Sequence, residues 1–149
     1  MNFGGIGMKY STKLSDTIHI LAFIYLGQGT KLTSAKIAES IKTNPAYVRQ
    51  QMSALKNAGI ISNTQGQANA SLTKPADQIT MLDIYRAVEG DKPLLHLDID
   101  TNPECGVGIN IQLSIADFYK EIQNVAEKEM QKITLQDIVE RYYEKLQEQ

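Results

Sequence analysis

The side chains with the clearest chemistry lie on a helix that we expect to begin at Asn44 and to end at Gly59. Asn can cap the free amides of a helix N-terminus, and Pro45 fixes the first-turn dihedral and has no amide to leave unpaired. If Val48 points inward, the opposite face and its flanks carry small, amide-bearing and cationic side chains and no acid. These outward residues are Ala46, Arg49, Gln50, Ser53, Lys56 and Asn57.

This face suits the major groove of DNA. A Gln side chain can form a paired contact with adenine, an Arg side chain can do the same with guanine, and small residues allow close approach. The free amides and the positive dipole end of the helix N-terminus favour a phosphate nearby. A polar surface helix of any soluble protein offers the alternative interpretation, a solvated face with no ligand.

A second group of reactive residues lies in a predicted loop around Cys105, the chain's single cysteine. One cysteine cannot form an internal disulfide or build a zinc or iron-sulfur site by itself. A Gly/Pro-rich loop makes the thiol accessible enough to sense oxidants, but the acids Asp98, Asp100 and Glu104 disfavour the thiolate. His96 could join Asp98, Asp100 and Cys105 around a metal, but this spacing is common by chance, so we expect no metal site.

The sequence shows no arrangement typical of a catalytic site: there is no Ser-His-Asp order, Walker loop or dinucleotide fingerprint. We therefore expect no enzymatic activity and no cofactor. The chain has 149 residues, of which 42% are hydrophobic and 21% charged. This composition predicts a chain that folds around one core and excludes the disordered class.

Nothing in the sequence predicts a membrane location. The longest apolar run, residues 18–26, is about half of the roughly 20 residues that a membrane span requires. It is interrupted by His19, which we expect to be packed. Residues 1–7 are Gly-rich and lack the basic and apolar regions of a signal peptide, so we expect them to be disordered and outside the fold. The sequence predicts a cytoplasmic protein with no membrane partner.

Charge is distributed unevenly along the chain. Residues 8–75 carry eight Lys/Arg against Asp16 and Glu39, a net charge of +6, and residues 76–149 carry seven against fifteen acids, a net charge of -8. A basic half joined to an acidic half suggests that the first half meets a polyanion and that the second has another role, such as self-association. Solvated surface charge is the alternative.

The order of elements in the basic half is that of a winged helix-turn-helix. We expect helices over residues 14–26, 33–41 and 44–58, with Thr33 and Asn44 as caps, and a hairpin of strands 60–64 and 70–73 around a loop at 65–69. Residues 42–44 form the turn. The first helix is expected to bury a stripe of apolar residues: Leu14, Ile18, Leu21, Ala22 and Tyr25.

The acidic half is predicted to be helical on both sides of a long loop. Thr80 with Asp83, and Thr134 with Asp137, form capping-box patterns that open two helices. Between them, apolar residues recur at alternating steps of four and three, which is coiled-coil spacing: Ile111, Ile115, Phe118, Ile122 and Val125. That stripe either pairs with a second copy or packs on its own domain. The last helix is expected to point Leu135, Ile138, Val139, Tyr142 and Leu146 inward.

Several segments resemble one family of regulators. The segments read SAKIAE at 34–39, NPAYVR at 44–49, LKNAGI at 55–60 and ITMLDIYRAVEG at 79–90, with a loop centred on Gly66. In order and spacing they resemble the Rrf-two (IscR-like) winged-helix transcription regulators, over nearly the whole chain from Met8. The segments ASL at 70–72 and NPECGVG at 102–108 resemble the YwnA-like subgroup.

The resemblance implies a homodimer whose long C-terminal helices pair. It also implies that a recognition helix and a wing from each subunit bind a palindromic operator. By position it assigns base or groove contacts to Ala46, Tyr47, Arg49 and Gln50, and a wing contact to Gln65.

Two departures from the family pattern change these expectations. Iron-sulfur members have three cysteines in the loop before the long helix, whereas this loop has only Cys105, at the last of those positions, so we expect no cluster. The wing has Gln65 where the family usually has Arg, and Asn69 and Ala70 where it has glycines. Without the arginine, the wing should contribute less electrostatic affinity.

These observations predict a mainly α fold with a small β-hairpin wing (α+β): a winged helix-turn-helix with C-terminal dimerisation helices. We expect a DNA-binding domain at 8–90, a loop at 91–108 and a helical dimerisation segment at 109–149. The predicted function is a sequence-specific repressor that binds double-stranded DNA as a homodimer. An effector, either a small molecule or an oxidant acting on Cys105, is left open. Lys36 and Asn44 complete the predicted DNA-binding set. The alternative is a winged-helix protein-interaction module without specific DNA binding.

Overall fold

The computed structural model describes residues 10–27, 31–63 and 70–149. Contacts divide the chain into two compact units, Met1–Thr73 and Lys74–Gln149. The predictions for residues 1–7 and for the hairpin loop at 65–69, which includes Gln65, lie outside the described residues.

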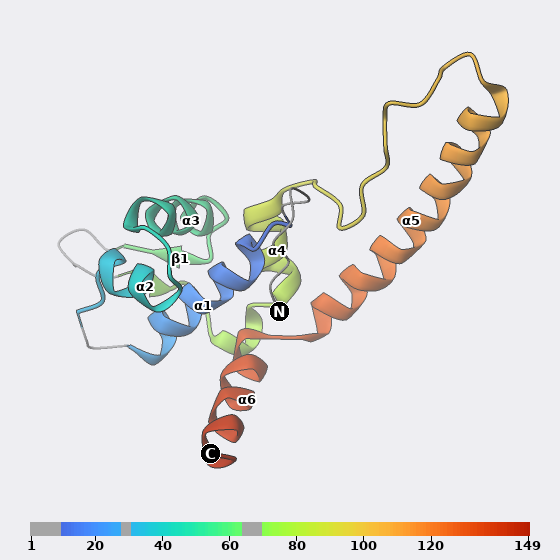
Figure 1. Cartoon of the computed structure of the whole chain (residues 1–149). Coiled ribbons are helices and arrows are strands. Elements are labelled where there is room, and N and C mark those ends of the chain that lie inside the picture. Colours follow the sequence, from blue (N-terminus) through green and yellow to red (C-terminus); the bar gives the residue numbers. More distant parts are fainter. Residues whose placement is uncertain (1–9, 28–30, 64–69) are drawn as a thin grey trace. The chain divides into compact units, whose positions relative to one another are not determined.

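The first unit has the predicted order of helices and strands (Figure 1). Its helices are α1 (Lys13–Leu26), α2 (Ser34–Ser40) and α3 (Pro45–Asn57), and its strands are β1 (Ile61–Ser62) and β2 (Ser71–Leu72). The strands are antiparallel, with Ile61 opposite Leu72 and Ser62 opposite Ser71. The mainly helical fold with a small hairpin wing is therefore confirmed.

The strands are shorter than predicted, and the helix end explains why β1 starts late. The amide of Ile60 donates to the carbonyl of Leu55 at 2.9 Å, which closes the end of α3. Since that amide serves the helix, Ile60 does not begin the strand. Gly59, with φ of +74°, takes the left-handed conformation that commonly ends a helix, as predicted.

The predicted caps of the helix-turn-helix are confirmed. The side chain of Thr33 accepts from the amide of Lys36 at 3.2 Å, and the side chain of Asn44 accepts from the amide of Tyr47 at 2.8 Å. Pro45 occupies the first turn of α3. These bonds satisfy amides that a helix N-terminus would otherwise leave without partners.

The buried face of α1 differs from the predicted stripe. The buried residues are Thr17, Ile20, Leu21 and Ile24, and the other members of the predicted stripe are half-buried. Because α1 is apolar on every side, periodicity could not select the inner face. His19, which was predicted to be packed, is exposed as a residue, although its ring stacks on Phe23 with ring centroids 5.2 Å apart.

The second unit consists of helices and a short 3-10 turn, η1 (Ala76–Gln78). Its helices are α4 (Met81–Glu89), α5 (Gly106–Lys132) and α6 (Leu135–Gln147). Both predicted capping boxes, at Thr80 and at Thr134, are present. The amide of Met81 donates to Ile133 at 2.8 Å and that of Leu135 donates to Ile79 at 2.9 Å, so the starts of α4 and α6 are held side by side.

The last helix is only partly buried. Leu135 and Val139 are buried, but Tyr142 and Leu146, which are predicted to point inward, are 44% and 48% exposed. The contacts of α6 with η1 explain the burial near its start, and the exposed residues lie in its later turns.

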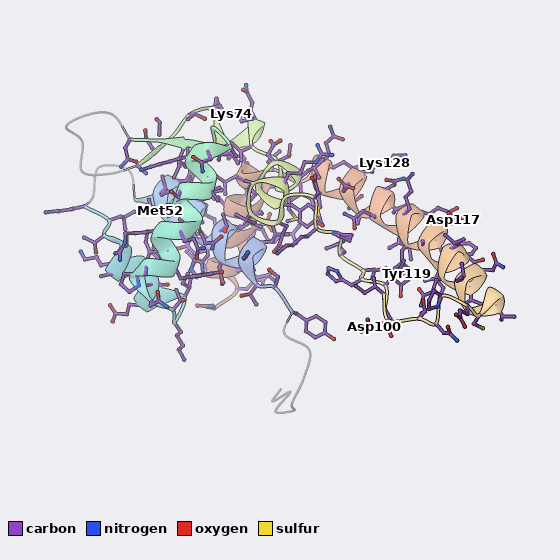
Figure 2. All side chains as sticks on the ribbon, turned by 90° about the horizontal axis from the view of Figure 1, so that it is seen from above. Met52, Lys74, Asp100, Asp117, Tyr119 and Lys128 are labelled. Carbon is purple, nitrogen blue, oxygen red and sulfur yellow. The ribbon has the colours of Figure 1, made fainter. Side chains whose placement is uncertain are left out.

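The long helix α5 starts at Gly106, three residues before the start predicted at residue 109. Cys105 caps it, because the Cys105 sulfur accepts from the amide of Gly108 at 3.4 Å. Cysteine is a weak acceptor and gives little sequence signal for a cap. In Figure 2, Asp117, Tyr119 and Lys128 mark the course of α5, and Asp100 marks the segment before it. No helix in the described ranges has the length and apolar character needed to cross a membrane.

Candidate nucleic-acid interface

The outward face of α3 is exposed as predicted. Val48 and Leu55 are fully buried on the inner face, together with the buried Gln51. Met52, labelled on α3 in Figure 2, is half-buried. The inner face of α3 is therefore formed by Val48, Gln51 and Leu55. All six outward residues are exposed: Ala46, Arg49, Gln50, Ser53, Lys56 and Asn57. Their charges are positive, since α3 contains Arg49 and Lys56 and no acid.

The turn before α3 is hydrogen-bonded back to the end of α2, and α2 packs against α3. The amide of Thr43 donates to the carbonyl of Ala38 at 2.9 Å, and that of Lys42 donates to Glu39 at 3.3 Å. Lys42 has φ of 53°, a left-handed conformation that reverses the chain within a short connection. Lys36, on α2, is exposed. The helix-turn-helix thus presents α3 on a second, packed helix.

Asn44 is exposed at the N-terminus of α3. Its cap uses only the side-chain carbonyl oxygen, which accepts from the amide of Tyr47. A side-chain amide also carries two N–H donors. Asn44 can therefore cap the helix and donate toward an anion at the same time.

Tyr47 lies differently from the other predicted contact residues. Its side chain is half-buried, and its hydroxyl donates to Oδ2 of Asp16 in α1 at 2.9 Å. The hydroxyl of Thr12 donates to the same oxygen at 3.0 Å. Sequence reasoning did not find this contact, because Asp16 and Tyr47 are 31 positions apart and no local pattern links them.

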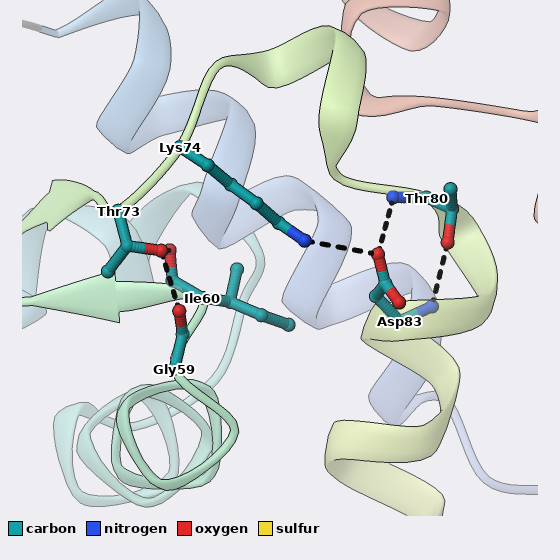
Figure 3. A network of polar contacts seen from close by, with 6 residues as sticks. All are labelled: Gly59, Ile60, Thr73, Lys74, Thr80 and Asp83. Carbon is teal, nitrogen blue, oxygen red and sulfur yellow. Dashed lines mark hydrogen bonds and ion pairs between the residues drawn. The ribbon is translucent and has the colours of Figure 1, made fainter.

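The base of the wing is tied to the end of α3. The Thr73 hydroxyl donates to the carbonyl of Gly59 at 2.6 Å and approaches that of Ile60 at 3.1 Å (Figure 3). The amide of Thr73 also donates to Ile60 at 3.0 Å. The hairpin is therefore anchored to the C-terminal end of α3.

A cavity of about 420 Å³ lies in the second unit, where α4, the chain that follows it and α5 meet. The hydroxyl of Tyr85 donates to the carbonyl of Lys92 at 2.7 Å and accepts from Gln123 at 3.2 Å. Gln123 also accepts from the amide of Leu94 at 2.9 Å. Arg86 and Glu127 form an ion pair at 3.1 Å on the same wall. These lining groups bond to one another, and no sequence pattern predicted them.

A second polar contact of this unit lies near the first turn of α4. The Nζ atom of Lys74 lies 3.7 Å from Oδ2 of Asp83 (Figure 3). The same oxygen of this capping-box carboxylate accepts from the amide of Thr80. Both side chains are about two-fifths exposed, so this ion pair is expected to add little stability.

Comparison with known proteins identifies the family. The model of the Rrf2 family, described as an iron-dependent transcriptional regulator, matches residues 10–141. The donor set of this chain does not fit iron: it has one cysteine, and its described residues bring no three His, Cys, Asp or Glu side chains together. His96, Asp98, Asp100 and Cys105 therefore do not form the metal set that was considered.

Individual proteins that resemble this chain support the same family assignment. A Bacillus subtilis (strain 168) protein named YwnA, an HTH-type transcriptional regulator by name, is 34% identical over 133 residues, which cover 89% of this chain and 98% of YwnA. A crystal structure described as a DNA-binding protein is 34% identical, with a TM-score of 0.70, and covers 86% of this chain and 99% of that one. CymR, the global cysteine regulator of B. subtilis, has the same fold, with 23% identity and a TM-score of 0.64 over 91% of this chain and 98% of CymR. The chain belongs to the Rrf2 family of transcriptional regulators, and its likeness to YwnA confirms the predicted subgroup.

Proposed function

We propose that this regulator is a homodimeric repressor that binds a palindromic operator in double-stranded DNA. The observation that carries the proposal is the exposed, acid-free face of α3, held on α2 by a short capped turn. The palindrome follows from the twofold symmetry of a dimer, which mirrors the symmetry of its site. The family is one of transcriptional regulators, and the repressor role is part of this proposal.

The residues of the face divide into two roles. Gln50 and Arg49 carry the side chains that pair with adenine and guanine, while Ala46 and Ser53 are small enough to let the backbone approach the bases. The remaining residues are placed at phosphates or at the groove edge: Lys36, Asn44, Lys56, Asn57 and, on the wing, Gln65. Phosphate contacts would set orientation and general affinity, and base contacts would set sequence preference.

The dimer is proposed from the surface of α5. None of its described residues is buried, and large apolar side chains are exposed along the predicted stripe, with Ile111 at 55%, Phe118 at 63% and Val125 at 69%. Apolar surface of this kind is usually covered by a partner. A second copy fits because the spacing over two heptads suits helix pairing, which assigns residues 109–149 to dimerisation.

DNase footprinting on the DNA upstream of the protein's own gene tests the proposal, because many regulators control themselves. We expect two protected half-sites arranged as an inverted repeat, with centres about one DNA turn, roughly 34 to 36 Å, apart. Protection that is lost when random duplex is added in modest excess would contradict sequence-specific binding.

A further inference from the structure

The carboxylate of Asp16 joins the first turn of α1 to the first turn of α3. Its Oδ2 atom accepts from the Tyr47 hydroxyl at 2.9 Å and from the Thr12 hydroxyl at 3.0 Å. Hydrogen bonds to an ionised carboxylate are stronger than neutral ones. Tyr47 is therefore fixed at two points, through its hydroxyl by Asp16 and through its backbone amide by Asn44.

This bond determines what the Tyr47 hydroxyl can do at DNA. A phenolic hydroxyl has one proton, and the phosphate oxygens of DNA are acceptors only. While that proton is donated to Asp16, Tyr47 cannot donate it to a phosphate. A direct phosphate contact by this hydroxyl would first require the bond to Asp16 to break.

The charge of Asp16 also needs an explanation. It is one of two acids in residues 8–75, a half with a net charge of +6, and it lies against the helix that carries the proposed DNA face. A carboxylate there repels the phosphates of every duplex and lowers affinity regardless of sequence. Because this acid lowers the affinity for all DNA, a benefit from it must lie in another property, such as the preference for one sequence over others.

We infer that Asp16 is a positioning residue for sequence reading, and that Tyr47 acts through Asp16 instead of through a phosphate. The bond sets the orientation of the first turn of α3 relative to α1. Arg49 and Gln50 follow directly after that turn. Asp16 thereby raises the preference for the operator over other sequences, at the cost of some affinity for all DNA. The inference rests on the proposed function.

A double-mutant cycle measured by fluorescence anisotropy tests it, with the footprinted operator and a random duplex of equal length. Tyr47→Phe and Asp16→Ala should each reduce the ratio of operator to random affinity by about 5- to 10-fold, the loss expected for one strong hydrogen bond. The double variant should lose no more than either single variant, because all three lack the same bond.

Two control variants separate positioning from charge. Asp16→Asn keeps an oxygen that can accept from Tyr47, so it should retain the operator preference while its affinity for both duplexes rises about 2- to 5-fold. Glu39→Gln removes the other acid of the basic half and should leave the ratio unchanged. Rescue by Asp16→Asn is the result that a merely structural role of the charge would not produce.

Different results overturn different claims. Tyr47→Phe could weaken operator binding by the same factor in the wild-type protein and in the Asp16→Ala variant. In that case the hydroxyl contacts DNA directly and the inference is wrong. If Asp16→Ala only raises affinity for both duplexes, Asp16 does not position the helix. If the wild-type protein does not distinguish the operator from random duplex, the proposed function fails together with this inference, and Gln50→Ala would then have no selective effect.

Discussion

The helices α3 and α5 differ in how much of their surface the chain itself covers. The inner face of α3 is buried through Val48, Gln51 and Leu55, its N-terminus is capped, and its exposed side chains are polar. α5 is twice as long, with 27 residues against 13, and has no buried residue and several exposed apolar ones. A polar face of this kind is stable in water and available to a charged ligand, whereas an apolar stripe calls for another protein surface. α3 is therefore the candidate DNA-binding helix, and α5 is the candidate dimer contact.

The largest effect is expected from breaking the α5 contact. Phe118→Asp places a charge in the exposed apolar stripe and should convert the dimer into a monomer, with operator affinity reduced about 100-fold or more because the two half-sites no longer bind as one unit. Sedimentation equilibrium gives the mass, and anisotropy gives the affinity. Lys120→Asp, at another exposed position of α5, is the matched control and should stay dimeric. A wild-type monomer at micromolar concentration would contradict the dimer.

A smaller effect is expected when the reading face of α3 loses one base contact. Gln50→Ala should cost about 1 to 3 kcal/mol on the operator and change the affinity for random duplex little, because a paired contact to adenine is specific. Titrations of both duplexes at one salt concentration measure this. Equal losses on the two duplexes would show that Gln50 does not read bases.

The stability of α3 itself depends on its cap. Asn44→Ala removes the acceptor of the Tyr47 amide and should lower the free energy of unfolding by about 1 kcal/mol. Urea unfolding followed by circular dichroism measures the change. Asn44→Ser keeps a capping oxygen and should restore most of the loss; if it does not, the cap is not the cause.

Lys56→Ala should have a modest effect that does not depend on sequence. Loss of one proposed phosphate contact should weaken operator and random duplex alike, and it should reduce the slope of log affinity against log salt by about 1 for each lysine lost. A salt titration from low to physiological ionic strength supplies both values. An unchanged slope would place Lys56 away from the phosphates.

The smallest effect is expected at Cys105. Cys105→Ser keeps an acceptor at the cap of α5, and a hydroxyl oxygen accepts hydrogen bonds better than sulfur does. Because one thiol cannot hold a cluster, wild type and variant should both be colourless and bind the operator equally without iron. An iron-sulfur absorbance band in the wild type that the variant lacks would overturn this expectation, and operator affinity after mild diamide treatment would reveal an oxidant response.

Features set by neighbouring residues could be predicted from the sequence. The caps at Thr33, Asn44, Thr80 and Thr134 each depend on residues three positions apart, and all four are present. The exposed face of α3 could also be predicted, because its polar and apolar residues alternate with helical period.

Features set by distant residues could not be predicted. The bond between Asp16 and Tyr47 and the network of Tyr85 with Gln123 join residues 31 and 38 positions apart. The inner face of α1 was missed because apolar residues surround that helix. The weak cap by Cys105 gave no signal, so the start of α5 was placed three residues too late.

The central claim is that α3 reads DNA sequence within a dimer. The most direct test compares the affinity of the wild-type protein for its footprinted operator with that for a duplex of the same length and base composition in scrambled order, at physiological salt. The account predicts a preference for the operator of about 1,000-fold or more, with one dimer bound per site. Equal affinities for the two duplexes would contradict it.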